Sequence, residues 1–189
     1  MQIDVWSDFT GPETLHMQDQ LTDAMEATGL EHELTLVRHS YEQDRTPGLR
    51  NTFDAHRCVH LAREHGCETP VWYALAQAAG DGVELGDREV LVPLVVAAGL
   101  DEAEVREMLA GDGSGYGVRV DEATAAMAEI NTVPAIVLGQ KYILTGVQPY
   151  ETVVAALERA WAERDVAPQA REVAGCGGGG CGGACACGR

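Results

Sequence analysis

Apolar and polar positions alternate at the start of the chain, where Ile3 and Val5 are spaced as in a half-buried strand. An apolar pattern at helical spacing follows, from Leu15 through Leu21 to Met25. Alternation returns over residues 33–38, after a glycine of the kind that commonly ends a helix. The first forty residues therefore predict a strand, a helix and a second strand parallel to the first.

Helical patterns dominate the middle of the chain. Residues 39–50 break the pattern with Pro47 and Gly48 and are predicted to form a loop. Helices are then predicted over about 53–62, 70–79, 87–98 and 101–110, with Asp87 and Asp101 as N-caps. A glycine-rich hinge at 111–115, a helix at about 121–129, a hairpin of strands 135–138 and 142–144, and a helix at about 150–164 complete the pattern.

The order of these elements predicts an α/β protein with a thioredoxin-like fold. Consecutive helices between two α/β segments are best explained as an inserted α-helical domain that packs as its own layer. The predicted boundaries are 1–50 and 116–165 for a discontinuous thioredoxin-like domain, 51–115 for the inserted helical domain, and 166–189 for a flexible tail rich in cysteine and glycine.

The junction between the first strand and the first helix is the first candidate for a functional site. Thr10 and Glu13 have the spacing of a capping box, in which each side chain bonds a free backbone N–H of the first turn. Pro12 suits that turn, because an N–H there would have no partner. A helix N-terminus that follows a strand favours a bound anion or a thiolate.

Charge and hydropathy exclude several functions. The 189 residues include 30 acidic against 13 basic side chains, a formal net charge of −17. Such a field repels nucleic acid and anionic membrane surfaces, so neither is expected as a partner. The sequence shows no apolar stretch long enough to span a membrane and no secretory signal pattern, so we expect a cytoplasmic protein.

The six cysteines fall into two groups. Cys58 lies in a helical apolar pattern and is predicted to be a core residue, and Cys67 follows nine residues later. A reducing compartment disfavours structural disulfides, so the cysteines near the C-terminus are expected to be metal ligands or redox groups. Four thiolates in a glycine-rich segment can close around Zn²⁺ or Cu(I); the alternative is a disordered tail with incidental cysteines. The candidate metal ligands are Cys176, Cys181, Cys185 and Cys187.

Three stretches of the sequence resemble the FrnE branch of the DsbA-like thioredoxin-fold oxidoreductases. They are residues 8–16, residues 51–57 with the sequence Asn-Thr-Phe-Asp-Ala-His-Arg, and Val133-Pro134 before the hairpin. Members of this family typically carry a C-P-W-C motif at the start of the first helix. Aligned on Pro12, the two cysteines of that motif correspond to Gly11 and Thr14. The resemblance thus predicts the family scaffold without its usual pair of thiols.

The resemblance also implies where substrate and catalytic residues would lie. Pro134 resembles the cis-proline that these proteins place opposite the active-site helix, although it could simply begin a strand. The implied substrate-binding residues are Gly11, Pro12, Thr14, Val133 and Pro134. FrnE-like proteins often end in a C-x4-C motif, which Cys176 and Cys181 match as candidate catalytic residues.

The sequence is compatible with three functions. The leading one is a thiol–disulfide oxidoreductase or isomerase that acts on protein thiols and disulfides through the tail cysteines. The second is a glutathione-dependent isomerase or transferase with a small thiol-linked substrate, because related kappa-class glutathione transferases and 2-hydroxychromene-2-carboxylate isomerases use a serine hydroxyl at the position of Gly11. The third is a non-catalytic module that binds a metal or a thiol. His56 and His60 have metal-ligand spacing, but a partly buried helix face is the favoured interpretation.

Overall fold

A four-stranded mixed sheet forms the centre of the computed structural model, which describes residues 1–43 and 51–165. The strands lie in the order β2-β1-β3-β4; β1 pairs parallel with β2 and antiparallel with β3, and β3 pairs antiparallel with β4. The strands are β1 (Gln2–Ser7), β2 (Thr35–Ser40), β3 (Ala135–Leu138) and β4 (Tyr142–Thr145). The helices are α1 (Glu13–Ala27), α2 (Phe53–Glu64), α3 (Glu68–Gly80), α4 (Arg88–Ala97), α5 (Glu102–Ala110), α6 (Gly115–Met127) and α7 (Tyr150–Ala162).

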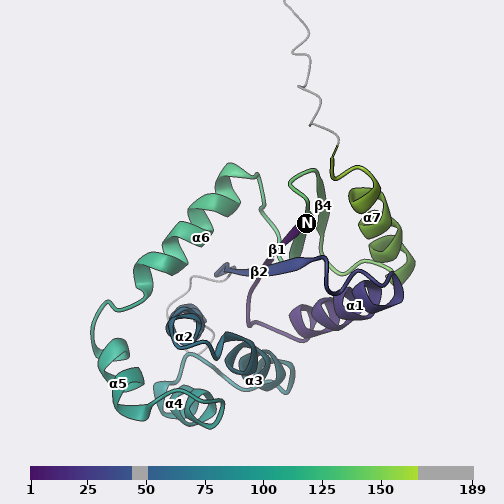
Figure 1. Cartoon of the computed structure of the whole chain (residues 1–189). Helices are drawn as coiled ribbons and strands as arrows, with labels where there is room; N and C mark the ends of the chain where they lie inside the picture. Colours follow the sequence, from purple (N-terminus) through teal and green to yellow (C-terminus); the bar gives the residue numbers. More distant parts are fainter. Residues whose placement is uncertain (44–50, 166–189) are drawn as a thin grey trace, which may run out of the picture.

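Helices cover both faces of the sheet (Figure 1). On one face, Ile3 and Val5 of β1 pack in a core with α1 and α7, to which Leu21 and Leu157 contribute. On the other face, Trp6 packs with residues of α6 and of the segment that leads into β3. This explains why β1 is buried along almost its whole length, because successive side chains of a strand enter opposite cores.

Helices α2 to α5 form a separate layer beside the sheet (Figure 1). Their core surrounds Trp72 and Leu75 and includes Cys58, which is fully buried as the sequence predicted. Phe9, from the turn between β1 and α1, belongs to this same core. The turn at the end of β1 is therefore held between the sheet and the helical layer.

The helix boundaries agree with the sequence patterns except at α6. The aspartates at 87 and 101 cap α4 and α5 as predicted, each accepting a hydrogen bond from a backbone N–H of the first turn. Helix α6 begins at Gly115, six residues before the predicted start, and so takes in the end of the predicted hinge. Its glycines suit close packing: a Cβ at Gly117 would lie 2.5 Å from Nδ1 of His60. The glycines therefore mark contact with α2, although glycine lowers helix propensity.

No helix among residues 1–43 and 51–165 combines the length and hydropathy that a membrane span requires.

Candidate functional site

The turn after β1 starts helix α1 in a different way from the predicted capping box. Pro12 is the N-cap, with φ −74° and ψ −14°, and its carbonyl accepts the His16 N–H at 3.0 Å. No side chain caps the helix, and Thr10 is exposed. The predicted capping box of Thr10 and Glu13 was wrong. The proline ring favours a helical φ at Pro12, so the helix is capped there, and Thr10 lies two residues before the N-cap.

Asp8 holds this turn to two other segments of the chain. Its carboxylate accepts hydrogen bonds from the N–H groups of Phe9 and Gln43, at 2.7 and 2.8 Å, and from the Thr52 hydroxyl. Nε2 of His56 lies 3.3 Å from the same carboxylate. Asp8 therefore joins the end of β1, the segment after β2 and the start of α2, while only 2% exposed.

The environment of Asp8 favours its ionised form. Burial raises the pKa of this carboxyl, but hydrogen bonds from His56, Thr52 and the Gln43 N–H together outweigh burial and leave the pKa below its ordinary value. A carboxylate with a lowered pKa and filled lone pairs is a weak general base. Asp8 thus positions the turn, and we assign it no proton transfer.

Thr14 is fixed by the main chain of the same turn. It lies buried in the first turn of α1, where its hydroxyl donates to the Asp8 carbonyl at 2.7 Å. The hydroxyl proton is therefore directed away from any bound substrate. This contact gives Thr14 a role in shaping the turn.

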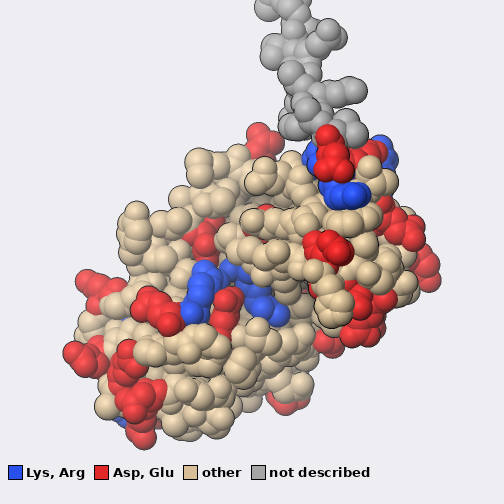
Figure 2. Space-filling model, viewed as in Figure 1, with Lys and Arg blue, Asp and Glu red and all other residues tan. Residues whose placement is uncertain are grey.

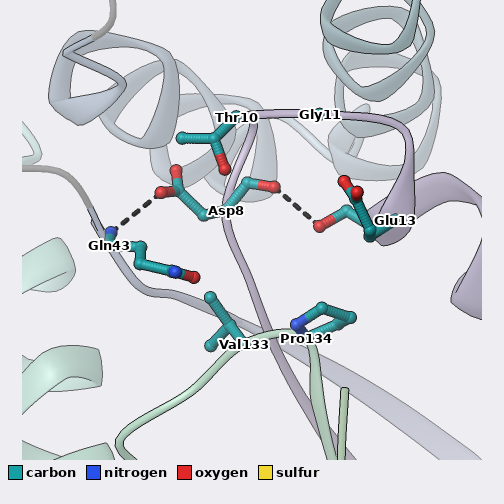
Figure 3. A pocket seen from close by; sticks show the side chains of 8 residues that line it. Asp8, Thr10, Gly11, Glu13, Gln43, Val133 and Pro134 are labelled. Carbon is teal, nitrogen blue, oxygen red and sulfur yellow. Dashed lines mark hydrogen bonds between the residues drawn. The ribbon is translucent and has the colours of Figure 1, made fainter. Parts of the chain in front are cut away.

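A pocket of about 300 Å³ lies between this turn and the segment before β3 (Figure 3). The Val133–Pro134 peptide bond is cis, and Pro134 faces the start of α1 across the pocket. The pocket brings together four of the predicted binding residues, Gly11, Thr14, Val133 and Pro134, and adds Asp8, Thr10, Glu13 and Gln43. Pro12 does not line it and lies instead near Gly80 at the end of α3.

No sulfur atom lines this pocket among the residues that the structure describes. Cys58 is fully buried in the helical layer, and burial, reinforced by the Asp54 carboxylate, raises the pKa of its thiol to about 12. Cys67 is the N-cap of α3. The predicted catalytic and metal-binding cysteines, Cys176, Cys181, Cys185 and Cys187, lie outside the described residues.

The two histidines at metal-ligand spacing bind carboxylates in separate places. His56 contacts Asp8, whereas Nε2 of His60 lies 3.0 Å from Asp121 on α6. Within residues 1–43 and 51–165, no group of three His, Cys, Asp or Glu side chains has an arrangement that could hold a metal ion. The side chain of His56 is buried and that of His60 is half-buried, so the two differ in environment as well as in partner.

A second polar cluster joins the sheet to α2 and α6. The ring nitrogens of His39 on β2 each lie 2.9 Å from a carboxylate, Asp4 on one side and Asp121 on the other. Asp121 also accepts the Ser40 N–H at 2.8 Å. Burial lowers the pKa of His39, but the bonds to Asp121 and Asp4 raise it by more, to a net value above the ordinary one. Both ring nitrogens can donate to these carboxylates when the ring is protonated, so the cluster favours the imidazolium form of His39.

Sequence reasoning missed this cluster and the role of Asp8. Asp8 had one local signal, its position directly after a strand and before a helix, where a carboxylate can bond the N–H groups of a turn. Asp4, His39 and Asp121 had none, because their contacts join segments up to 82 residues apart in a chain of 30 acidic side chains.

Comparison with known proteins places this fold in a family. The model of the DSBA-like thioredoxin domain matches residues 2–158. The chain belongs to the DsbA-like thioredoxin family. A search of curated protein sequences finds no match. The family and the thioredoxin-like fold with inserted helices, both expected from the sequence, are confirmed.

Solved structures of this fold include oxidoreductases and an isomerase. A probable DsbA oxidoreductase from Streptomyces coelicolor is 27% identical, with a TM-score of 0.81 over 95% of this chain and 100% of its own. The disulfide oxidoreductase DsbA from Proteus mirabilis is 16% identical, with a TM-score of 0.61 over 83% of this chain and 88% of its own. A 2-hydroxychromene-2-carboxylate isomerase is 14% identical, with a TM-score of 0.67 over 86% and 97%. The last two similarities concern the fold alone.

Proposed function

We propose that this DsbA-like protein, of the FrnE branch, is a thiol–disulfide oxidoreductase whose pocket binds the substrate and whose tail supplies the sulfurs. The observation that carries the proposal is the pocket itself, formed by the start of α1 and the Val133–Pro134 segment. Gly11 and Thr14, which the resemblance to the FrnE branch aligns with the paired cysteines of its C-P-W-C motif, both line it. The site thus keeps a surface for substrate and lacks a nucleophile of its own among the described residues.

An extended peptide fits this surface. A DsbA from Proteus mirabilis has been crystallised with a non-covalently bound peptide, Pro-Trp-Ala-Thr-Cys-Asp-Ser. In the present chain, polar groups of Thr10 and Gln43 and the apolar side chains of Val133 and Pro134 line the pocket, so it offers hydrogen bonds together with an apolar contact.

The chemistry proposed for the tail is two-step thiol–disulfide exchange. The thiolate of Cys176 or Cys181 attacks one sulfur of a substrate disulfide, forms a mixed disulfide and releases the other substrate sulfur as a thiolate. The second tail thiolate then attacks the protein sulfur of the mixed disulfide. The substrate leaves reduced by two electrons, the two tail cysteines become a disulfide, and an added dithiol reduces them for the next cycle. About a dozen residues separate Arg164 from Cys176, a length of chain that can span up to about 40 Å when extended.

Reduction of insulin in the presence of dithiothreitol tests this assignment. The double variant Cys176→Ser, Cys181→Ser should lose the activity above the background of the reductant, whereas Cys185→Ser, Cys187→Ser should keep it. The first variant should still bind a cysteine-free peptide, because its pocket is unchanged. Equal activity of the wild type and the Cys176→Ser, Cys181→Ser variant would contradict the proposal.

Binding of glutathione distinguishes the proposed function from the alternative one. An isomerase or transferase of the glutathione-dependent kind requires that glutathione occupy the pocket at millimolar concentration, which a calorimetric titration measures directly. We expect no saturable binding there, since Gly11 has no hydroxyl at the position where the related isomerases and transferases carry a serine. Saturable glutathione binding that Gly11→Trp abolishes would favour the isomerase or transferase instead.

A further inference from the structure

The described residues that line the pocket carry negative charge. Asp8 and Glu13 are the two carboxylates, and none of the described lining residues is Lys, Arg or His. The remaining lining side chains are two threonines, a glutamine, a valine and a proline, with Gly11 between them. A substrate that enters the pocket therefore finds acidic side chains and, among the described lining residues, no basic one.

The two carboxylates differ in what they can offer a ligand. Asp8 is 2% exposed, and its oxygens already accept hydrogen bonds from Phe9, Gln43 and Thr52. Glu13 is exposed, and within the described residues its carboxylate makes no hydrogen bond or ion pair. The charge of Glu13 is therefore available to a ligand, whereas that of Asp8 is directed into the protein.

The position of Glu13 places this free charge at the pocket. Its Oε2 atom lies 2.5 Å from the point that a Cβ on Gly11 would occupy, so the carboxylate folds back over the turn (Figure 3). The N-terminus of α1 carries a partial positive charge equivalent to about half an elementary charge. The full negative charge of Glu13 exceeds that partial charge, so the local field at the mouth of the pocket remains negative.

The rest of the molecule strengthens this preference. The chain has a formal net charge of −17. Acidic side chains spread over both halves of the face seen in Figure 2, whereas basic ones gather in its centre and near the end of α7. Such a field raises the rate at which cationic ligands arrive and slows anionic ones.

We propose that the pocket selects cationic substrates: extended peptides that carry Lys or Arg beside the residue bound against Pro134, with Glu13 as the residue that reads the charge. This inference rests on the proposed function, because it names the substrate class of the same pocket. It disfavours glutathione, which bears two carboxylates and one amine, and acidic peptides. Glu13 is a specificity residue here and takes no part in the exchange of sulfurs.

Fluorescence polarisation with two cysteine-free peptides tests the proposal on the full chain. The peptides are identical except that two positions carry Lys in one and Glu in the other. The wild type should bind the Lys peptide at least tenfold more tightly at low salt, and the ratio should shrink as salt screens the charges. Glu13→Gln should reduce the preference by about threefold, the effect expected for one solvent-accessible ion pair.

A matched control separates the pocket from the overall field. Glu107→Gln removes the same charge from an exposed position on α5, a helix that contributes no residue to the pocket, and should change the preference less than twofold. Equal binding of the two peptides, or an equal effect of the two variants, would overturn the charge selection while leaving the proposed function standing. Binding of neither peptide would overturn both.

Discussion

The two threonines near the start of α1 contribute to the turn in the reverse of the way that their sequence positions suggest. Thr10 has the capping-box spacing and is exposed, whereas Thr14 looks like an ordinary first-turn residue and is buried. The hydroxyl of Thr14 donates to the Asp8 carbonyl, so it fixes the turn that forms one side of the pocket. The structure thus assigns to Thr14 the stabilising role that the sequence assigned to Thr10.

Substitution of each threonine tests that assignment. Thr14→Val should lower the free energy of unfolding by about 1 kcal/mol, because the Asp8 carbonyl loses its side-chain donor in a buried position. Thr10→Ala should change it by less than about 0.5 kcal/mol, as is usual for an exposed side chain. Urea denaturation of both variants provides the comparison. A larger loss of unfolding free energy for Thr10→Ala than for Thr14→Val would contradict this assignment and support the capping box.

The turn should also accept the cysteines that it lacks. The double variant Gly11→Cys, Thr14→Cys should reduce insulin much faster than the wild type, because the α1 N-terminus stabilises a thiolate and lowers its pKa. A Cβ on Gly11 would meet Oε2 of Glu13, the end of a flexible side chain that can move aside. The control is Gly11→Ser, Thr14→Ser, which adds hydroxyls in place of thiols. A folded double-cysteine variant without a gain would show that this turn does not activate thiols.

At the scale of single residues, the sequence predicts positions better than contacts. Gly11, Thr14, Val133 and Pro134 were expected in one site and line one pocket. The fold places these four residues together, and the order of elements that defines the fold can be predicted from the periodicity of apolar residues. The hydrogen bonds of Asp8 could not be predicted, because its donors come from segments that meet only after the sheet and α2 have packed together.

At the scale of elements, a polar cluster connects the sheet to the helices beside it. His39 of β2 lies between Asp4 of β1 and Asp121 of α6, and His60 of α2 contacts Asp121 from the other side. Trp6 stacks on the His39 ring with 4.2 Å between the ring centroids. His39 therefore connects β1, β2 and α6.

The stability of the protein should depend on pH through this cluster. The raised pKa of His39 contributes stability that is complete below its ordinary value of 6.5 and is lost as pH rises through the folded value. The lowered pKa of Asp121 acts in the other direction: hydrogen bonds from His39, His60 and the Ser40 N–H outweigh burial, and their contribution is lost as pH falls below the ordinary value of 3.8.

Urea denaturation at a series of pH values measures these contributions. The wild type should lose stability above pH 6.5, and His39→Gln should show a smaller loss over the same range. At pH 6 the variant should be less stable than the wild type by about 1–3 kcal/mol, because two partly buried carboxylates lose a charged donor. Parallel pH profiles for the two proteins would mean that His39 does not titrate with folding.

Element boundaries show where sequence patterns lose precision. The hairpin and the N-caps of α4 and α5 were placed correctly, because turn residues and capping aspartates act locally. The start of α6 was missed because two glycines in its first turn resemble a hinge. Position 117 requires glycine because a side chain there would collide with His60, a contact that no local pattern reveals.

At the scale of the whole molecule, the six cysteines should differ widely in reactivity. Cys58 should react slowly with iodoacetamide, because it is fully buried and its pKa is raised to about 12. Cys176 and Cys181, with glycine on both sides, should react first. Mass-spectrometric mapping of alkylated cysteines at short reaction times gives the order. Labelling of Cys58 or Cys67 ahead of the tail would contradict the expected distribution.

Capture of a mixed disulfide tests most directly whether the pocket binds the substrate while the tail reacts with it. Single variants Cys176→Ser and Cys181→Ser are mixed with a peptide whose cysteine carries a thionitrobenzoate leaving group, and the attachment site is mapped by mass spectrometry. A second sample contains excess peptide with serine in place of cysteine. The account predicts attachment at the remaining member of the Cys176 and Cys181 pair, slowed by the serine peptide because it fills the pocket. Attachment at Cys58 or Cys67, or a rate that the serine peptide leaves unchanged, would contradict it.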